Sequence, residues 1–252
     1  MLIPEKFYEM YGIRSINIKE KYYSKNNNVY WIQAYGEGNI PMDLAVKFYK
    51  RSRYSFNKEV DILKHLKECG VRVPDIYYTS NNLIIMERIS GEVLLDRILA
   101  LENTEGNLIS KEARKIIYEL SIWLKSFYRG MKKWKKRLYI KEDVNLRNFI
   151  YSDKIYGIDF ENCHPGFIEE DIGKLCAFIL TYTPEFTPWR CKFTDALIQI
   201  FSQEFAIDTE LVIREMKNEI EVIAERRNTK YSTELIEVMI NSWRKQKILY
   251  KV

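Results

Sequence analysis

The feature that most constrains this chain is a pair of short strand-like runs around a turn. Residues 149–151 (Phe-Ile-Tyr) are rich in strand formers, Ser152-Asp153 is typical of a turn, and residues 155–158 are again strand-like. The pattern predicts a tight hairpin that reverses at residues 152–153. The two ends of such a hairpin lie side by side, so side chains just outside it meet at one end.

Three polar side chains flank this predicted hairpin. Asn148 enters it, Asp159 leaves it, and Asp143 lies in the loop just upstream. Two carboxylates and a carboxamide would therefore converge at one end. All three are hard oxygen ligands or proton acceptors, which suit Mg²⁺ and phosphate chemistry better than zinc or redox chemistry.

The cysteine and histidine content argues against a zinc site. The chain has four cysteines and only two histidines, with no Cys-x-x-Cys pair. So little histidine also disfavours hydrolases that depend on a histidine base. Unpaired cysteines are typical of a reducing compartment, so a cytoplasmic protein is expected.

Length, charge and hydropathy narrow the class further. With 252 residues the chain can form one large domain or two lobes. No apolar run approaches the length of a membrane span, so none is expected. The net charge is only +5 and the charges are interspersed, which makes nucleic acid unlikely as the primary ligand. Nothing in the sequence indicates an oligomeric state.

The first ninety residues are mainly strand-like. Alternating or β-branched runs predict strands at 29–35, 44–49 and 83–86. Between them, apolar residues at helical spacing predict a helix over 55–69, which Gly70 would end.

After Gly91 the character becomes helical. Helices are predicted at 111–131, about 169–182, 187–205 (with Thr187 as its cap and Pro188 in its first turn), 208–226 and 232–250. A strand-rich start and a helical remainder indicate an α+β protein with two lobes. We place them at residues 1–88 and 89–252.

A lysine in a strand, an acid in the next helix and then Asp…Asn…Asp form an ordered series. This order resembles the protein-kinase-like superfamily over about residues 20–180. The similarity is greatest to its small atypical branch: aminoglycoside phosphotransferases, choline-kinase-like enzymes, RIO-type kinases and lipopolysaccharide kinases. The resemblance implies a bilobal kinase-like fold, with an N-terminal antiparallel sheet lobe carrying one helix and a helical C-terminal lobe carrying the catalytic-loop hairpin.

Lys47 and Glu59 resemble the family's ion pair. Lys47 lies in Leu-Ala-Val-Lys, close to the family motif Val-Ala-Ile-Lys, and would reach the phosphates of ATP. Glu59, at the opening of its helix, would hold Lys47. Asp61 competes for this role but sits about 200° around the helix. The alternatives are a surface lysine and a first-turn glutamate stabilised by the helix dipole.

The stretch Leu83-Ile-Ile-Met-Glu-Arg-Ile-Ser-Gly resembles the connector between the lobes. The resemblance implies that main-chain groups of Glu87 and Ile89 bind the adenine. Met86 would line the purine pocket or simply belong to the core.

The nucleotide loop is expected between residues 23 and 30. It has no Gly-x-Gly-x-x-Gly, but Ser24 and Asn27 are small polar residues that let backbone N–H groups approach phosphates. An ordinary hairpin turn is the alternative.

Asp143-Val-Asn-Leu-Arg-Asn148 resembles the family's catalytic loop, although Lys141-Glu142 replaces the usual His-Arg or His-Gly. The resemblance implies that Asp143 takes the proton of the acceptor hydroxyl and that Asn148 and Asp159 bind Mg²⁺. Arg147 would neutralise the transferred phosphoryl group or be a surface arginine.

The region after Asp159 bears on the class of molecule that accepts the phosphoryl group. Glu161 replaces the family's glycine, and about ten residues lead to the next helix, where Asp171 resembles the aspartate that braces the catalytic loop. A long regulated activation loop is therefore not expected. The leading hypothesis is an ATP- and Mg²⁺-dependent kinase that phosphorylates a hydroxyl of a small molecule or glycan. The alternatives are a RIO-like serine/threonine protein kinase and a nucleotide-binding pseudokinase.

Overall fold

The computed structural model describes residues 3–37, 40–50 and 53–249. Its contacts divide the chain into two compact units. The first extends to Ser90 and also contains Asp159–Glu161, and the second consists of Gly91–Ile158 and the chain from Asn162 onward. Among the described residues, no helix is long and apolar enough to span a membrane.

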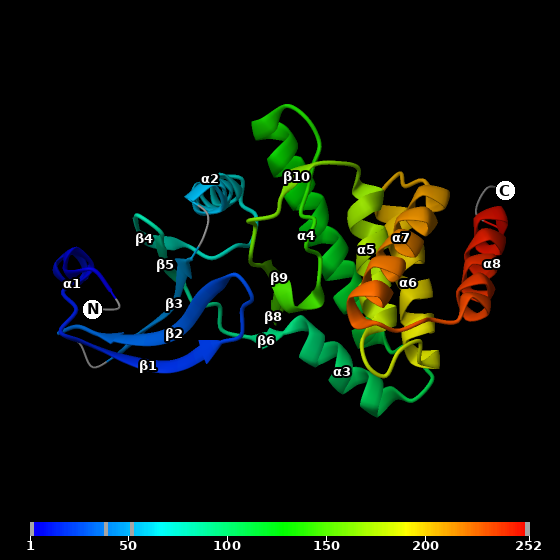
Figure 1. Cartoon of the computed structure of the whole chain (residues 1–252), viewed down its shortest axis with the longest axis horizontal. Coiled ribbons are helices and arrows are strands. Elements are labelled where there is room, and N and C mark those ends of the chain that lie inside the picture. Colours follow the sequence, from blue (N-terminus) through cyan, green and yellow to red (C-terminus); the bar gives the residue numbers. More distant parts are fainter. Residues whose placement is uncertain (1–2, 38–39, 51–52, 250–252) are drawn as a thin grey trace. The chain divides into compact units, whose positions relative to one another are not determined.

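The first unit is an antiparallel sheet with two helices (Figure 1). The five strands run in the order β1-β2-β3-β5-β4. Their bounds are Ser15–Tyr22 (β1), Asn27–Tyr35 (β2), Met42–Tyr49 (β3), Ile76–Ser80 (β4) and Leu83–Glu87 (β5); the helices are Glu5–Tyr11 (α1) and Arg53–Glu68 (α2).

The alternation of side chains along β3 gives its two faces different roles. Leu44 and Val46 are buried in an apolar core with Phe7 of α1. Lys47 and Tyr49 face the other way, where the Tyr49 ring packs against Phe56 of α2 at 5.5 Å between ring centroids. The sheet thus directs the Lys47 side chain of β3 toward α2.

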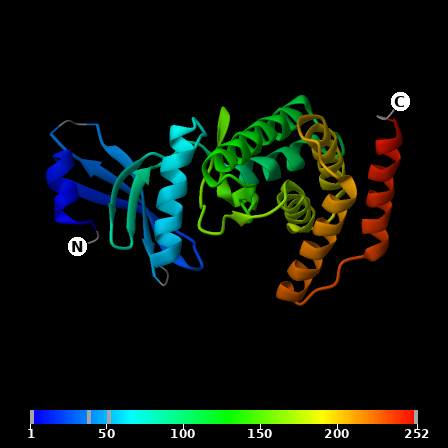
Figure 2. The same cartoon turned by 90° about the horizontal axis from the view of Figure 1, so that it is seen from above.

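The second unit is mainly helical. Its helices are Leu94–Glu105 (α3), Lys111–Lys135 (α4), Ile168–Thr181 (α5), Pro188–Glu204 (α6), Thr209–Arg227 (α7) and Thr233–Leu249 (α8). Helix α5 packs along α7, as Figure 2 shows. The strands Glu92–Val93 (β6), Phe149–Ser152 (β8) and Lys154–Gly157 (β9) form a small sheet in the order β6-β8-β9, and Tyr139–Ile140 (β7) pairs with His164–Pro165 (β10).

Local signals in the sequence correspond closely to the elements. The predicted hairpin forms as β8 and β9, with Asp153 at its turn at φ +59°. Helix α6 begins at Pro188, and the Thr187 side chain caps it by accepting from the Arg190 N–H. Gly70 follows α2 at φ +73°, where L side chains are disfavoured. The mixed α+β fold with a sheet lobe and a helical lobe is confirmed.

Several elements were not predicted, and the start of one helix was wrong. The missed elements are helices α1 and α3 and strands β1, β4, β6, β7 and β10. Strand β1 is an edge strand whose side chains are mostly exposed, so it lacks the alternation that marks a half-buried strand. Helix α2 begins at Arg53, so Glu59 lies within the helix rather than at its opening. The interpretation of Glu59 as a first-turn residue stabilised by the dipole is therefore wrong.

Candidate active site

Lys47 is the centre of a charged cluster in the first unit. Its Nζ donates to a carboxylate oxygen of Glu59 at 2.7 Å and of Asp159 at 2.8 Å. Only 4% of Lys47 is exposed, so these pairs are largely shielded from water. The Tyr49 hydroxyl donates to the same Glu59 oxygen. The lysine is thus held from two sides in one orientation.

The local structure explains why these residues meet. Lys47 and Tyr49 are two positions apart on β3 and share a face. Glu59 lies on the buried stripe of α2 and is 1% exposed, whereas Asp61 is exposed. The partner of Lys47 is therefore Glu59.

Burial and charge act in opposite directions on this cluster. Burial alone lowers the pKa of Lys47, but the nearby carboxylates of Glu59, Asp159 and Glu161 outweigh it, so its pKa is raised and the ammonium stays charged. Burial raises the pKa of Glu59, and Lys47 partly offsets that rise. The cationic lysine is what makes a buried carboxylate tolerable here.

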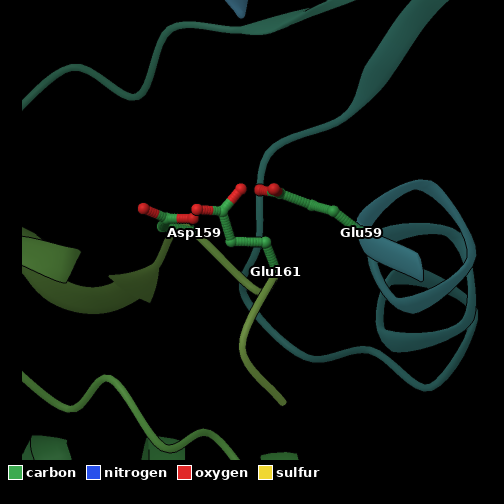
Figure 3. Close-up of side chains that lie close together, drawn as sticks. All are labelled: Glu59, Asp159 and Glu161. Atoms are coloured by element: carbon green, nitrogen blue, oxygen red, sulfur yellow. The ribbon is translucent and has the colours of Figure 1, made fainter. Parts of the chain in front are cut away.

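Three carboxylates gather around the lysine. One oxygen each of Glu59, Asp159 and Glu161 lies within 4.8 Å of the others, and the side chains point toward one another (Figure 3). Glu161 also accepts a hydrogen bond from the Asn27 side chain at 2.9 Å. Carboxylate oxygens are the ligands that Mg²⁺ prefers, so the donor set is chemically compatible with a divalent cation.

The expected nucleotide-loop residues are already engaged with one another. Ser24 and Asn27 lie at and after the β1–β2 turn, and Ser24 Oγ accepts from the Asn27 N–H at 3.3 Å. Asn27 is 5% exposed, and its side chain holds Glu161. The backbone N–H of Asn27 is therefore occupied, and the side chain is the part that reaches the acidic cluster.

The connector residues differ in what they offer. The Glu87 N–H donates to the Asp75 carbonyl at 2.8 Å. The N–H of Ile89, outside any helix or strand, has no main-chain partner among the described residues. Met86 is buried in β5, 8% exposed. Of the two main-chain donors, Ile89 is the one left for a ligand.

In the second unit, Asp143 and Asn148 lie on one short loop. The Asn148 side-chain amide donates to the Asp143 carbonyl at 3.2 Å, and the Asn148 carbonyl accepts from the Ile158 N–H at 3.0 Å. The second bond closes the base of the hairpin, as the sequence predicts. Because its nitrogen is used, the side-chain oxygen of Asn148 is the atom left for a metal ion.

Asp171 of α5 anchors this loop from beneath. It is completely buried, and its carboxylate accepts from the Lys141 and Glu142 N–H groups, both at 2.8 Å, and from the Tyr128 hydroxyl at 3.0 Å. Burial raises the pKa of Asp171 to about 6, although these donors favour its charged form. The loop is thus positioned through its backbone.

Lys141 occupies the position where the family usually has histidine. It is fully buried, its Nζ donates to the Asp143 carbonyl at 3.0 Å, and it lies 5.5 Å from the centre of the Phe149 ring. One carbonyl therefore accepts from both Lys141 and Asn148. Arg147 is exposed on the same loop.

Asp143 also borders a pocket of about 420 Å³ in the second unit. Its lining is polar and carries both signs of charge; the residues are Glu142, Asp143, Asn162, His164, Lys174, Phe178, Glu219 and Arg226. Glu142 pairs with Lys174 and His164. Burial raises the pKa of Glu142, but Lys174 and His164 lower it by more than burial raises it. The pKa of Glu142 is therefore below its usual value.

Comparison with known proteins identifies the family of this chain. The model of the RIO domain matches residues 45–178, just over half of the chain, from Lys47 through Asp171. The chain belongs to the RIO domain family. It is thus an atypical member of the protein-kinase-like superfamily.

Two curated relatives carry the name EKC/KEOPS complex subunit BUD32. The protein of Enterocytozoon bieneusi is 33% identical over 104 residues, which are 41% of this chain and 49% of the relative. The protein of Encephalitozoon cuniculi is 27% identical over 107 residues, 41% of this chain and 44% of the relative. The matched region thus spans about half the length of either relative.

A solved structure confirms the fold over nearly the whole chain. Amicoumacin kinase hAmiN, solved with AMP-PNP, Ca²⁺ and Ami, matches with a TM-score of 0.57 over 97% of this chain and 93% of its own. The sequence identity is 13%, so the likeness concerns the fold.

Sequence reasoning missed several contacts of the candidate site. Tyr49 could have been found from its two-residue spacing to Lys47 on one strand face. Lys141 was visible only as a departure from a motif. The hydrogen bond between Asn27 and Glu161 joins residues 134 positions apart, so no local sequence pattern could predict it.

Proposed function

We propose that this RIO domain is an ATP- and Mg²⁺-dependent kinase that phosphorylates a serine or threonine hydroxyl of a protein. The family match and the two BUD32 relatives support a protein acceptor over the small-molecule acceptor expected from the sequence. The relatives are named as subunits of a complex, which also fits a chain that works with protein partners.

The observation that carries the proposal is the buried Lys47 held by Glu59 and Asp159. A charged lysine whose side chain is already ordered can donate to phosphate oxygens without a further loss of side-chain conformational entropy. In this role Lys47 exchanges one of its carboxylate partners for the nucleotide, and Glu59 keeps it aligned. The main-chain N–H of Ile89 and the side chain of Met86 are assigned to the adenine, together with Glu87. Ser24 and Asn27 are assigned to the phosphates.

Asn148 and Asp159 are assigned to the metal through their side-chain oxygens. A bound Mg²⁺ ion supplies charge neutralisation at the ATP phosphates. Asp159 would then serve two cations, since one of its oxygens already accepts from Lys47. Glu161 adds negative charge beside it.

Asp143 is assigned to the acceptor. It orients the hydroxyl and takes its proton as the acceptor oxygen bonds to the γ-phosphorus and the bond to the ADP oxygen breaks. Arg147, exposed on the same loop, is assigned to the charge of the transferred group. The carbonyl of Asp143, held by Lys141 and Asn148, keeps the carboxylate in place.

A small-molecule or glycan hydroxyl is the second candidate acceptor. Two observations favour it: only six residues separate Glu161 from α5, and Asp143 borders a polar pocket of about 420 Å³. A short connection leaves no segment of the kind that orders a peptide substrate in regulated kinases.

The test is ADP release with Mg-ATP and two sets of acceptors. One set contains serine- and threonine-bearing proteins, including the chain itself, with phosphorylated sites read by mass spectrometry. The other contains aminoglycosides, choline-like alcohols, sugars and lipid-A-type glycans. Phosphoserine or phosphothreonine that disappears in Asp143→Asn would support the proposal. Turnover with a small alcohol alone would favour the second candidate, and Mg²⁺-dependent ATP binding without any turnover would identify a pseudokinase.

A further inference from the structure

The densest run of like charge in the chain lies outside the proposed active site. Residues 129–137 read Arg-Gly-Met-Lys-Lys-Trp-Lys-Lys-Arg and contain six cations and no acid. The whole chain has a net charge of +5, so all its other residues together carry −1. The low net charge that makes nucleic acid unlikely as a ligand is therefore an average that hides this run.

The structure gathers part of this run at the end of one helix. The run covers the last two turns of α4 and the residues just after it. Arg129, Lys132 and Lys133 are exposed and follow the spacing i, i+3, i+4, which places them on one side of the helix. The exposed Lys136 follows directly as the C-cap residue, at φ +59°. From Arg129 to its last residue the helix rises about 9 Å, at about 1.5 Å per residue. We call these four residues the basic face.

None of the six cations in this run has an acidic partner anywhere in residues 3–37, 40–50 and 53–249. Earlier on the same helix, Lys125 pairs with Glu204 at 3.0 Å. The two cations of the run that lie off the face are instead near aromatic rings: Lys135 is 3.4 Å from the centre of the Trp134 ring, and Arg137 is 5.4 Å from that of Tyr139. The basic face is therefore uncompensated positive charge.

The helix dipole explains only part of this arrangement. Cations in the last turn are stabilised by the partial negative charge of the helix C-terminus. Like charges at i, i+4 repel each other, and Arg129 lies almost two turns before the end of the helix. Helix stability alone would be served by fewer cations placed closer to the end.

We propose that the basic face binds the sugar–phosphate backbone of a nucleic acid. A duplex presents about six phosphates for every 10 Å along its axis. Such a dense row of negative charge matches closely spaced cations better than the scattered acids on a folded protein do. A lipid surface fits less well because the exposed large apolar side chains of the described chain include none between residues 129 and 139. Point charges without base-reading groups fit the backbone rather than a particular sequence.

The experiment compares two triple variants of α4 that remove equal charge. Arg129→Gln/Lys132→Gln/Lys133→Gln removes most of the basic face. Lys111→Gln/Arg114→Gln/Lys115→Gln removes one arginine and two lysines with the same spacing from the start of the helix, where Glu112 and Glu119 accompany the cations. All six positions are exposed. Binding of the full chain to fluorescent 20-nucleotide RNA and to a duplex of the same length is followed by anisotropy at several salt concentrations.

The unmodified chain and the Lys111 variant set should bind alike, and the basic-face variant should bind at least about tenfold more weakly at low salt. Loss of three phosphate contacts should also reduce the slope of log K against log salt by about 2 for single strands. ATP consumption and the thermal midpoint should not distinguish the two variants. Equal loss in both variants, no binding at low salt, or binding only to phosphatidylserine vesicles or to an acidic protein would overturn the proposal.

Discussion

The two units hold their candidate site residues in different ways. In the first, Lys47, Glu59 and Asp159 hold one another through side-chain charge. In the second, the loop that carries Asp143 and Asn148 is held through its backbone, because Asp171 accepts from two consecutive main-chain N–H groups. Asp143 itself is left to border a pocket.

This difference predicts different responses to substitution. A cluster that works through side-chain charge should lose activity when a charge is removed while its shape is kept. A loop anchored by one buried acid should lose stability first, since removing the anchor leaves buried donors without acceptors. Four substitutions test this contrast, in order of decreasing effect.

Asp159→Asn should have the largest effect. It keeps the shape and tolerates the positive φ of +60° at this position, but it removes the charge that faces Lys47 and the assigned metal. We expect ATP turnover to fall by roughly 10²–10³-fold or more, with little change in the free energy of unfolding. Asp153→Asn, at the exposed turn of the same hairpin and also at positive φ, is the matched control. Retention of turnover in Asp159→Asn would contradict the metal assignment.

Asp171→Ala should act on stability instead. It would strand the N–H groups of Lys141 and Glu142 and the Tyr128 hydroxyl, each at a cost of about 1–3 kcal/mol. We expect a total loss of about 3 kcal/mol or more in urea unfolding. Asp171→Asn keeps one acceptor oxygen and should lose less. If both variants unfolded like the unmodified chain while losing only activity, the backbone anchor would not be the way this loop is held.

Glu59→Gln should reduce turnover by roughly 10–100-fold, because the residue acts through Lys47 rather than on the substrate. The loss should appear partly as a higher KM for ATP, since Lys47 would be less well aligned. Asp61→Asn is the control two positions along on the exposed side of α2. Equal effects of the two substitutions would show that the ion pair does not align Lys47.

The smallest effect concerns pH and Glu142. Lys174 and His164 lower its pKa below the usual 4.5, so its stabilisation is fully present above about pH 4.5 and is lost as the pH falls through the lower folded value. The unmodified chain should therefore exceed Glu142→Gln in unfolding free energy by up to about 1 kcal/mol at pH 7. The difference should vanish at more acidic pH in parallel urea titrations. A constant difference at all pH values would show that packing, not charge, is responsible.

Much of the fold was predictable because its signals are short-range. Apolar residues at helical spacing located α4 to within four residues, and the Thr187 cap and Pro188 located the start of α6. The exposed edge strand β1 was not predictable, because it buries too little to leave a period-two pattern. Helix α2 was found, but its first turn was not, which misplaced Glu59 within it.

The features of the candidate site likewise fall into those that local sequence predicts and those that depend on tertiary packing. By itself the sequence determined the order of Lys47, Glu59, Asp143, Asn148 and Asp159 and the hairpin that joins the last two, since both depend on residue type and local spacing. The choice of Glu59 over Asp61 as the partner of Lys47 was also predicted, from the angle between them around the helix, and is confirmed. Only the tertiary structure decided that Asn27 holds Glu161 and that Lys141 is buried and donates to the Asp143 carbonyl. Those outcomes depend on which faces of separate elements pack together, and the burial that sets their energies exists only once the chain is folded.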